Sequence, residues 1–351
     1  MADRHERIGY LDELKGLAAF LVVLGHLVTA KQEYRGIYNF IYSFHMPLFM
    51  FVSGITAALS FRRGKRNYLA RRFLNIMVPY LTWCILLPVI QTLLHGGSIN
   101  WQEEFVSMFV TNTAYWFLPT LYGLLVSYML YVIIADFVRQ KMGKGCEEGS
   151  DSLSGKGFWT WREGMSVQFL AWCVTAALFL ILYLLTGYQL LRDMIGYMIP
   201  FSLAVLYVEN SWVKGLFHTK GILLLCILLY VVFLPWFDFD RASVATSLLR
   251  MLLGMSMTVI LLYLFADRRV PAVLHKILTF WGKYTLLIYI LHGVMMGWSR
   301  LFEGMVTGRI WIFVWYCLLS GLICSLCCIV GMGLSHVPVV RIFCLGKGKR
   351  R

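Results

Sequence analysis

The chain of 351 residues is 59% hydrophobic and only 14% charged, with a mean hydropathy of +0.70. This composition excludes an ordinary water-soluble domain and predicts an integral membrane protein in contact with membrane lipids. The formal net charge of +14 does not indicate a nucleic acid partner, because the basic residues gather in alternate loops between apolar segments. The sequence therefore predicts an all-α fold, a polytopic transmembrane helix bundle.

Successive apolar segments along the chain predict about ten membrane spans, since one helical crossing needs about 20 apolar residues. The predicted spans are 11–30, 37–61, 73–94, 116–138, 167–187, 194–208, 221–237, 244–266, 277–298 and 310–334. The span at 194–208 is short and follows its neighbour closely, so a hairpin inside the bundle, and totals of nine or eleven, stay open.

The distribution of Lys and Arg predicts that both termini are cytoplasmic. With this topology, 25 of the 32 basic residues lie on the inner side, and the other seven are Lys31, Arg35, Arg192, Arg241, Arg250, Arg300 and Arg309. Segment 11–30 is charged near its start, so we interpret it as a retained helix and not a signal peptide. We expect one membrane domain over residues 1–351, with a flexible cytoplasmic loop at about 139–166 and a basic tail at about 341–351.

The first span carries the best candidates for chemistry. At about 100° per residue, Asp12, Lys15 and His26 share one helix face. Eleven steps of about 1.5 Å separate Lys15 from His26 by about 16 Å, too far for a hydrogen bond. The spacing suits a long ligand with an anionic end near Lys15 and a reactive end near His26. A neutral imidazole is able to take a proton from a hydroxyl, although a structural role for the histidine is the alternative.

Other polar residues in the spans are candidates for a second part of the site, because ionisable groups are rare in bilayers. The predicted topology places His26, His45, Arg250 and His292 in the outer half of the membrane, where they would share one acceptor chamber. Pro47 interrupts the backbone near His45, so His45 and Ser53 either bind substrate or belong to a packing kink.

Two clusters have simpler alternatives. Six cations between residues 62 and 72 either contact anionic lipid or bind phosphate groups through arginine. Cys324, Cys327 and Cys328 lie in an apolar segment without a second pair of ligands, so no metal site is predicted.

Several motifs together resemble the acyltransferase-3 family of integral membrane O-acyltransferases, in its stand-alone sugar O-acetyltransferase form. They are Tyr10 to Ala18 with Val22 to His26, Phe44 to Phe49 with Ser53-Gly54, Arg71-Arg72 leading to Val78-Pro79-Tyr80, Tyr115 to Pro119, and Gly282 to Leu286 through Tyr289 to His292. The resemblance runs from about Ile8 to Leu334. Its most specific element is a basic residue followed, eleven positions later, by a histidine, here Lys15 and His26.

The resemblance implies roles for individual residues. His26 would be catalytic, while Lys15, Arg71 and Arg72, with Asp12, would bind the acyl donor. Trp116 would join His45, Ser53, Arg250 and His292 on the acceptor side. The family's two arginines three positions apart are not reproduced, because Asn75 stands where the second would be.

The resemblance also implies the reaction. Acetyl-coenzyme A or another short acyl-coenzyme A would be the co-substrate, with no bound cofactor, and a hydroxyl of a cell-surface glycan or lipid-linked sugar would accept the acyl group at the cell (plasma or inner) membrane. A transporter or exporter of a small or acylated molecule, using the same intramembrane polar residues, is the alternative.

Overall fold

The computed structural model describes residues 9–29, 31–63, 67–112, 115–143, 156–266, 270–297 and 308–346. Over these ranges the chain is helical and contains no strand, which confirms the all-α prediction. The elements are α1 (Gly9–Val28), η1 (Gln32–Tyr34), α2 (Arg35–Arg63), α3 (Tyr68–Arg72), η2 (Phe73–Met77), α4 (Val78–His95), α5 (Trp101–Phe109), α6 (Phe117–Gly143), α7 (Lys156–Thr186), α8 (Gln189–Glu209), α9 (Ser211–Phe217), α10 (Lys220–Phe233), η3 (Leu234–Trp236), α11 (Val244–Ala266), α12 (Ala272–Gly282), α13 (Thr285–Met295), α14 (Arg309–Leu334) and α15 (Pro338–Leu345).

Seven helices in the described ranges are long and apolar enough to cross a membrane, and the number rises to nine if each of two bent pairs is one span. The bent pairs are α9 with α10 and α12 with α13. The first predicted span corresponds to α1, which is not one of these seven helices and carries Asp12, Glu13 and Lys15 in its first two turns. A multi-span membrane protein is therefore supported, whereas the total of ten and the side of each terminus stay predictions.

Three predicted segments differ from the observed helices. The span 277–298 is not one straight helix, because α12 and α13 meet at a bend of 85°. The short span 194–208 belongs to the 21-residue helix α8, long enough to cross a bilayer without a hairpin. The loop predicted at 139–166 is shorter, since α6 runs to Gly143 and α7 begins at Lys156. The remainder of that loop, and the tail beyond Gly346, lie outside the described residues.

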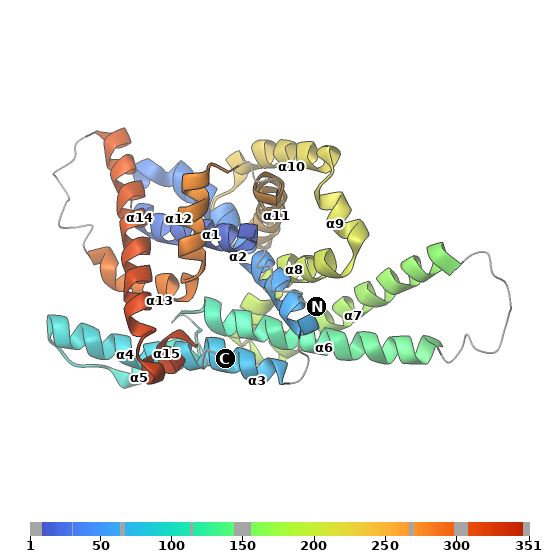
Figure 1. Cartoon of the computed structure of the whole chain (residues 1–351), viewed down its shortest axis with the longest axis horizontal. Coiled ribbons are helices and arrows are strands. Elements are labelled where there is room, and N and C mark those ends of the chain that lie inside the picture. Colours follow the sequence, from blue (N-terminus) through green and yellow to red (C-terminus); the bar gives the residue numbers. More distant parts are fainter. Residues whose placement is uncertain are drawn as a thin grey trace.

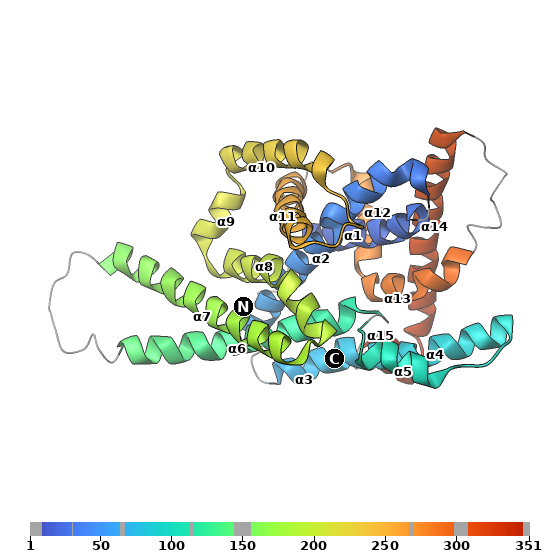
Figure 2. The ribbon, with the colours of Figure 1, turned by 180° about the vertical axis from the view of Figure 1, so that it is seen from behind.

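The long helices run in several directions (Figure 1). In that view α14 stands upright, while α4 and α6 lie across the page below α1 and α2. Figure 2 shows the same arrangement from behind, with α10 and α11 on the far side of α8 from α6. These helices share one core, since α2 packs against both α8 and α11 and α1 packs against α12.

Two glycines bring α1 and α12 into backbone contact. A Cβ atom on Gly16 would lie 2.0 Å from the Leu278 carbonyl oxygen, and one on Gly282 would lie 1.9 Å from the Asp12 carbonyl oxygen. Small residues at helix crossings permit such an approach in membrane proteins. Glu13 strengthens the crossing, because its Oε1 lies 2.7 Å from Nδ1 of His275. The crossing sets the position of the α12–α13 bend relative to Lys15.

The C-terminal helix α15 packs against the start of α4. The indole Nε1 of Trp83 donates to the Cys344 carbonyl at 3.0 Å. Gly346, with a φ of +60°, lies so close to the Asn75 backbone that a Cβ would be 2.3 Å from its carbonyl oxygen. Asn75 belongs to η2, a single π-helical turn, and such turns are frequent at functional sites.

Candidate active site

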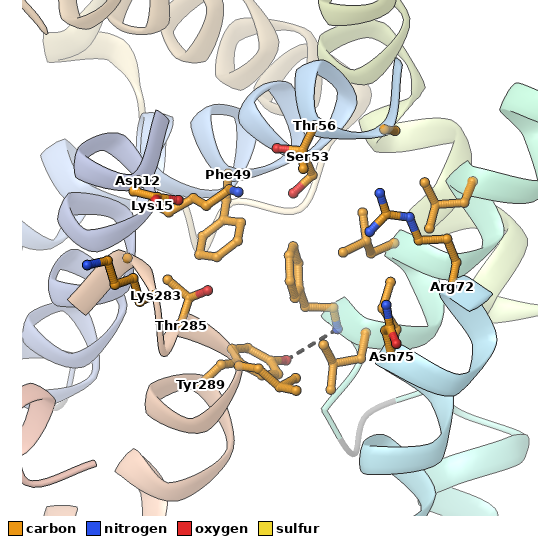
Figure 3. Close-up of a pocket in the computed structure, with 18 residues that line it drawn as sticks. Asp12, Lys15, Phe49, Ser53, Thr56, Arg72, Asn75, Lys283, Thr285 and Tyr289 are labelled. Atoms are coloured by element: carbon orange, nitrogen blue, oxygen red, sulfur yellow. Dashed lines mark hydrogen bonds between the residues drawn. The ribbon is translucent and has the colours of Figure 1, made fainter. Parts of the chain in front are cut away.

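A cavity of about 280 Å³ lies between α1, α2, the α3–η2 turn, α6 and the α12–α13 bend. Figure 3 shows the side chains around it. Both polar and apolar residues line it: Asp12, Lys15, Phe49, Ser53, Thr56, Ala57, Arg72, Asn75, Ile76, Phe117, Leu118, Leu121, Leu125, Gly282, Lys283, Thr285, Leu286 and Tyr289. Residues from five parts of the sequence therefore form one site.

The cationic groups of Lys15 and Arg72 enter this cavity from opposite sides (Figure 3). Arg72 is held in place because its guanidinium donates to Ser60 Oγ and its Cζ lies 5.3 Å from the Tyr68 ring centroid. The Lys283 amine points away from the cavity, although its residue contributes to the wall (Figure 3). Two cations facing one space form a suitable site for a phosphate-bearing ligand.

The other predicted donor residues take different positions. Asp12 is buried and lines the cavity beside Lys15. Arg71 is exposed and does not line it. Asn75, at the position of the family's second arginine, does line it, so an uncharged amide stands there. The cavity wall thus has one arginine where the resemblance implies two.

A series of aromatic rings leads from the cavity to His26. Phe49 and Phe117 have ring centroids 4.8 Å apart, and Phe117 and Tyr289 are 5.3 Å apart. The Tyr289 hydroxyl also accepts the Phe117 backbone N–H at 3.3 Å (Figure 3). Tyr289 lies 6.2 Å from His292, whose ring stacks on His26 at 5.1 Å. A chain of ring contacts therefore links the cation-lined cavity to the candidate catalytic histidine.

His26 is the exposed member of a group of three histidines from α1, α2 and α13. His45 and His292 are buried, and electrostatic interactions link His26 to each of them. No described residue hydrogen-bonds the ring nitrogens of His26, so no protein group within the described ranges engages them. The structure brings together the three histidines that the sequence placed in one chamber.

The two buried histidines have defined tautomers when neutral. Nδ1 of His45 lies 2.8 Å from the Ile41 carbonyl oxygen, and Nδ1 of His292 lies 3.0 Å from that of Ile288. A carbonyl oxygen only accepts, so each Nδ1 must carry the hydrogen. Nε2 of each ring then keeps its lone pair. In its neutral form each ring therefore offers one acceptor nitrogen.

Trp116 and Arg250 both pack against Tyr197. Trp116 stacks on Tyr197 at 5.6 Å, and the Arg250 Cζ lies 5.3 Å from the Tyr197 ring centroid. Arg250 also interacts electrostatically with His45. Ser53 is not part of this group, because it lines the cavity together with Lys15 and Arg72.

A loop between η3 and α11 packs over this second group. Arg35 pairs with Asp238 and Asp240, and the Tyr38 hydroxyl donates to Asp240 at 3.0 Å. The hydrogen bond from Arg35 keeps the pKa of Asp240 below its ordinary value. These contacts hold Phe239 against Tyr42, with ring centroids 4.6 Å apart.

The sequence alone predicts no role for Phe49, Phe117 or Tyr289. All three lie within or beside motifs of the acyltransferase-3 resemblance, but an aromatic residue in an apolar span is more often ordinary core. The three rings come together because of the α12–α13 bend and the approach of α6 to α2, and local sequence spacing predicts neither feature. Only the positions of these residues in the family motifs could have identified them as candidates.

The chain matches a known protein family. Residues 8–329 match the family described as "Acyltransferase domain" (Acyl_transf_3). The chain therefore belongs to this family of acyltransferase enzymes, which confirms the resemblance seen in the motifs. No solved structure matches the chain significantly.

Two curated relatives match part of the chain. Nodulation protein NolL of Sinorhizobium fredii is 32% identical over 142 residues, and NolL of Mesorhizobium japonicum is 27% identical over 139 residues. In both cases the matched segment covers 36% of this chain and 36% of the relative. The chain is thus similar to NolL over about a third of that protein's length.

Proposed function

We propose that the protein transfers a short acyl group, in the simplest case acetyl, from acyl-coenzyme A to a hydroxyl of a cell-surface glycan or lipid-linked sugar at the cell membrane. The observation that carries this proposal is the series of ring contacts from the Lys15–Arg72 cavity through Phe117, Tyr289 and His292 to His26. Coenzyme A needs cationic groups for its phosphates at one end and a reactive centre for its thioester at the other.

In this mechanism His26 is the general base. Its neutral imidazole takes the proton from the acceptor hydroxyl as the oxygen attacks the thioester carbonyl carbon. The carbon–sulfur bond then breaks, and the coenzyme A thiolate leaves and takes up the proton from the imidazolium. Lys15 and Arg72 bind the donor phosphates through charge-assisted hydrogen bonds. No orienting carboxylate is needed, because stacking on His292 holds the His26 ring.

The test uses purified protein in detergent with acetyl-coenzyme A and a set of sugar acceptors. We expect release of free coenzyme A that depends on acceptor, together with a product heavier by one acetyl group in mass spectrometry. His26→Ala should lower the rate by about 10²–10⁴-fold, the usual contribution of a general base. His336→Ala, which removes an exposed histidine between α14 and α15, is the matched control and should retain activity.

The transport alternative gives the opposite result. A transporter would move substrate across proteoliposomes without releasing coenzyme A, and its flux would survive His26→Ala. Acceptor-independent coenzyme A release would also contradict acyl transfer, because it would reveal a hydrolase. Mass spectrometry of the surface glycans of cells with and without the protein would then identify the natural acceptor.

A further inference from the structure

Arg250 is a partly buried cation whose hydrogen-bonding capacity is unused. Its Nε atom is buried without a partner, and no described residue forms a hydrogen bond or an ion pair with the guanidinium. A guanidinium has five donors in a planar fork, and leaving donors unpaired away from water is costly. The energetic balance of this position therefore favours a ligand that accepts hydrogen bonds.

Two aromatic rings flank this guanidinium. Its Cζ lies 5.3 Å from the ring centroid of Tyr197 and 5.8 Å from that of Phe239. Contacts of this kind stabilise the cation but use none of its N–H groups. They hold the guanidinium against two rings, and its planar fork favours planar or tetrahedral oxyanions that bind through two oxygens.

The carboxylate with which Arg250 interacts electrostatically is already engaged elsewhere. That carboxylate belongs to Asp193, whose Oδ2 accepts the Asn112 Nδ2–H at 3.0 Å and whose Oδ1 lies 3.9 Å from the Arg192 Nε. Asp193 is therefore held by Asn112 and Arg192, and it forms no ion pair with Arg250. A mobile anion is left as the natural partner.

The position of Arg250 connects it to the proposed reaction. Phe239, one of the two rings beside the guanidinium, packs on Tyr42, and Tyr42 packs on His45. Tyr42 borders the same space, with its ring 4.9 Å from His45 and 4.6 Å from Phe239. Trp116, stacked on Tyr197, adds a further aromatic face of the kind on which sugar rings lie.

We propose that Arg250 binds an oxyanion on the acceptor, a carboxylate or a phosphate, so that the enzyme acylates a hydroxyl of an anionic sugar in preference to a neutral one. This inference rests on the proposed acyl transfer and adds the charge of the acceptor to it. The two sources of the anion are an acidic sugar and a sugar joined to a lipid phosphate, and both offer the same oxygens to the guanidinium.

The experiment compares acceptors that differ only in charge. Acetyl transfer to a glucoside, the matching glucuronide, glucose 1-phosphate and a polyprenyl diphosphate glucose is measured for the purified wild-type protein. We expect kcat/KM to be at least tenfold higher for one anionic class than for the neutral glucoside, and the class that is preferred identifies the source. Arg250→Gln should remove this preference, whereas Arg250→Lys, which keeps the charge but not the fork, should keep part of it.

The matched control is Arg241→Gln, which removes an exposed cation from the neighbouring loop and should leave the preference unchanged. Equal use of neutral and anionic sugars by the wild type would overturn the inference, as would a preference that survives Arg250→Gln. Rising salt should weaken the preference, since it competes for an accessible cation.

A binding measurement separates this inference from the proposed function. Glucuronate and inorganic phosphate are titrated against the protein, with tryptophan fluorescence as the readout because Trp116 lies beside Tyr197. Saturable binding that is lost in Arg250→Gln and retained in His26→Ala supports the anion site even if no acyl transfer is detected. Acyl transfer without any Arg250-dependent anion binding would reject the site and leave the proposed function intact.

Discussion

The imidazole rings of His26 and His292 stack with their centroids 5.1 Å apart and their planes inclined by 29°. This contact joins α1 to α13, whose direction changes by 85° from that of α12. His292 is fixed in turn by its hydrogen bond to the Ile288 carbonyl. A buried and anchored ring thus orients the exposed one, in a role that catalytic sites often assign to a carboxylate.

We expect His292 to act as a positioning residue. His292→Ala should lower kcat about tenfold with little change in either KM, because His26 would lose its stacking partner and occupy unproductive rotamers. His292→Phe keeps a ring at that position and should recover most of the rate. The pH profile should stay that of His26 in both variants. A Phe variant as slow as the Ala variant would show that the His292 nitrogen itself is required.

Lys15 and Arg72 should determine the affinity for the donor. Lys15→Ala or Arg72→Ala removes a charge-assisted contact worth about 1.5–3 kcal/mol, so the KM for acetyl-coenzyme A should rise about 10- to 100-fold. The KM for the acceptor should be unchanged. Steady-state kinetics with each substrate varied in turn measures both values.

Arg71→Ala is the control for this pair of variants, because Arg71 is exposed and does not line the cavity. Its donor KM should stay within about twofold of the wild-type value. An equal rise in all three variants would indicate a diffuse effect of surface charge, and the cavity would lose its assignment as the donor site.

The glycine contacts between α1 and α12 predict a stability effect. Gly16→Ala and Gly282→Ala place a methyl group about 2 Å from a backbone carbonyl oxygen, so the helices must separate. Overpacking of this kind costs about 1–3 kcal/mol. Both variants should lower the midpoint of thermal unfolding in detergent. Gly333→Ala, in α14, has nothing within 4 Å of the added methyl and should unfold at the wild-type temperature.

The Arg35–Asp240 contact predicts how the loop over Arg250 responds to pH. The pKa of Asp240 is lowered in the folded protein, so its contribution to stability is full above the ordinary value of 3.8 and is lost as the pH falls through the lower folded-state pKa. The loop should therefore be insensitive to pH between about 5 and 8. Asp240→Asn should release it at neutral pH.

Hydrogen exchange measures this release. The Phe239 amide donates to Asn39 Oδ1 at 3.2 Å, and its exchange should accelerate in Asp240→Asn and in Arg35→Gln. Arg241→Gln, in the same loop, should exchange at the wild-type rate. If the Phe239 amide exchanged at the wild-type rate in both Asp240→Asn and Arg35→Gln, the packing of Phe239 on Tyr42 would hold the loop without the ion pairs.

Much of this architecture could be predicted from local sequence. The apolar segments identified most of the helices, because their length and hydropathy are local properties. The shared face of Asp12, Lys15 and His26 followed from helical period alone. The grouping of His45 and His292 with His26 depended on assumed depths in the membrane, and the structure brings these rings together.

Other features could not be predicted because they arise from contacts between distant helices. The α12–α13 bend lies at Gly282, where the α1 backbone approaches, and apolar residues continue on both sides of it. Ser53 points into the cavity with Lys15 and Arg72, because α2 borders the same space as α1 and the α3–η2 turn. The helical ends of the 139–166 segment continue α6 and α7 despite their polar composition.

The close contact between Gly346 and Asn75 has a practical consequence for anyone who produces this protein. Asn75 lines the cavity, so the C-terminal end of α15 supports its wall from behind. We expect a purification tag or fluorescent reporter fused after Arg351 to disturb the contact between Gly346 and Asn75. Weak donor binding measured with such a fusion would then be an effect of the fusion and not a property of the natural protein. An N-terminal fusion with a cleavable linker is the safer choice for kinetic work.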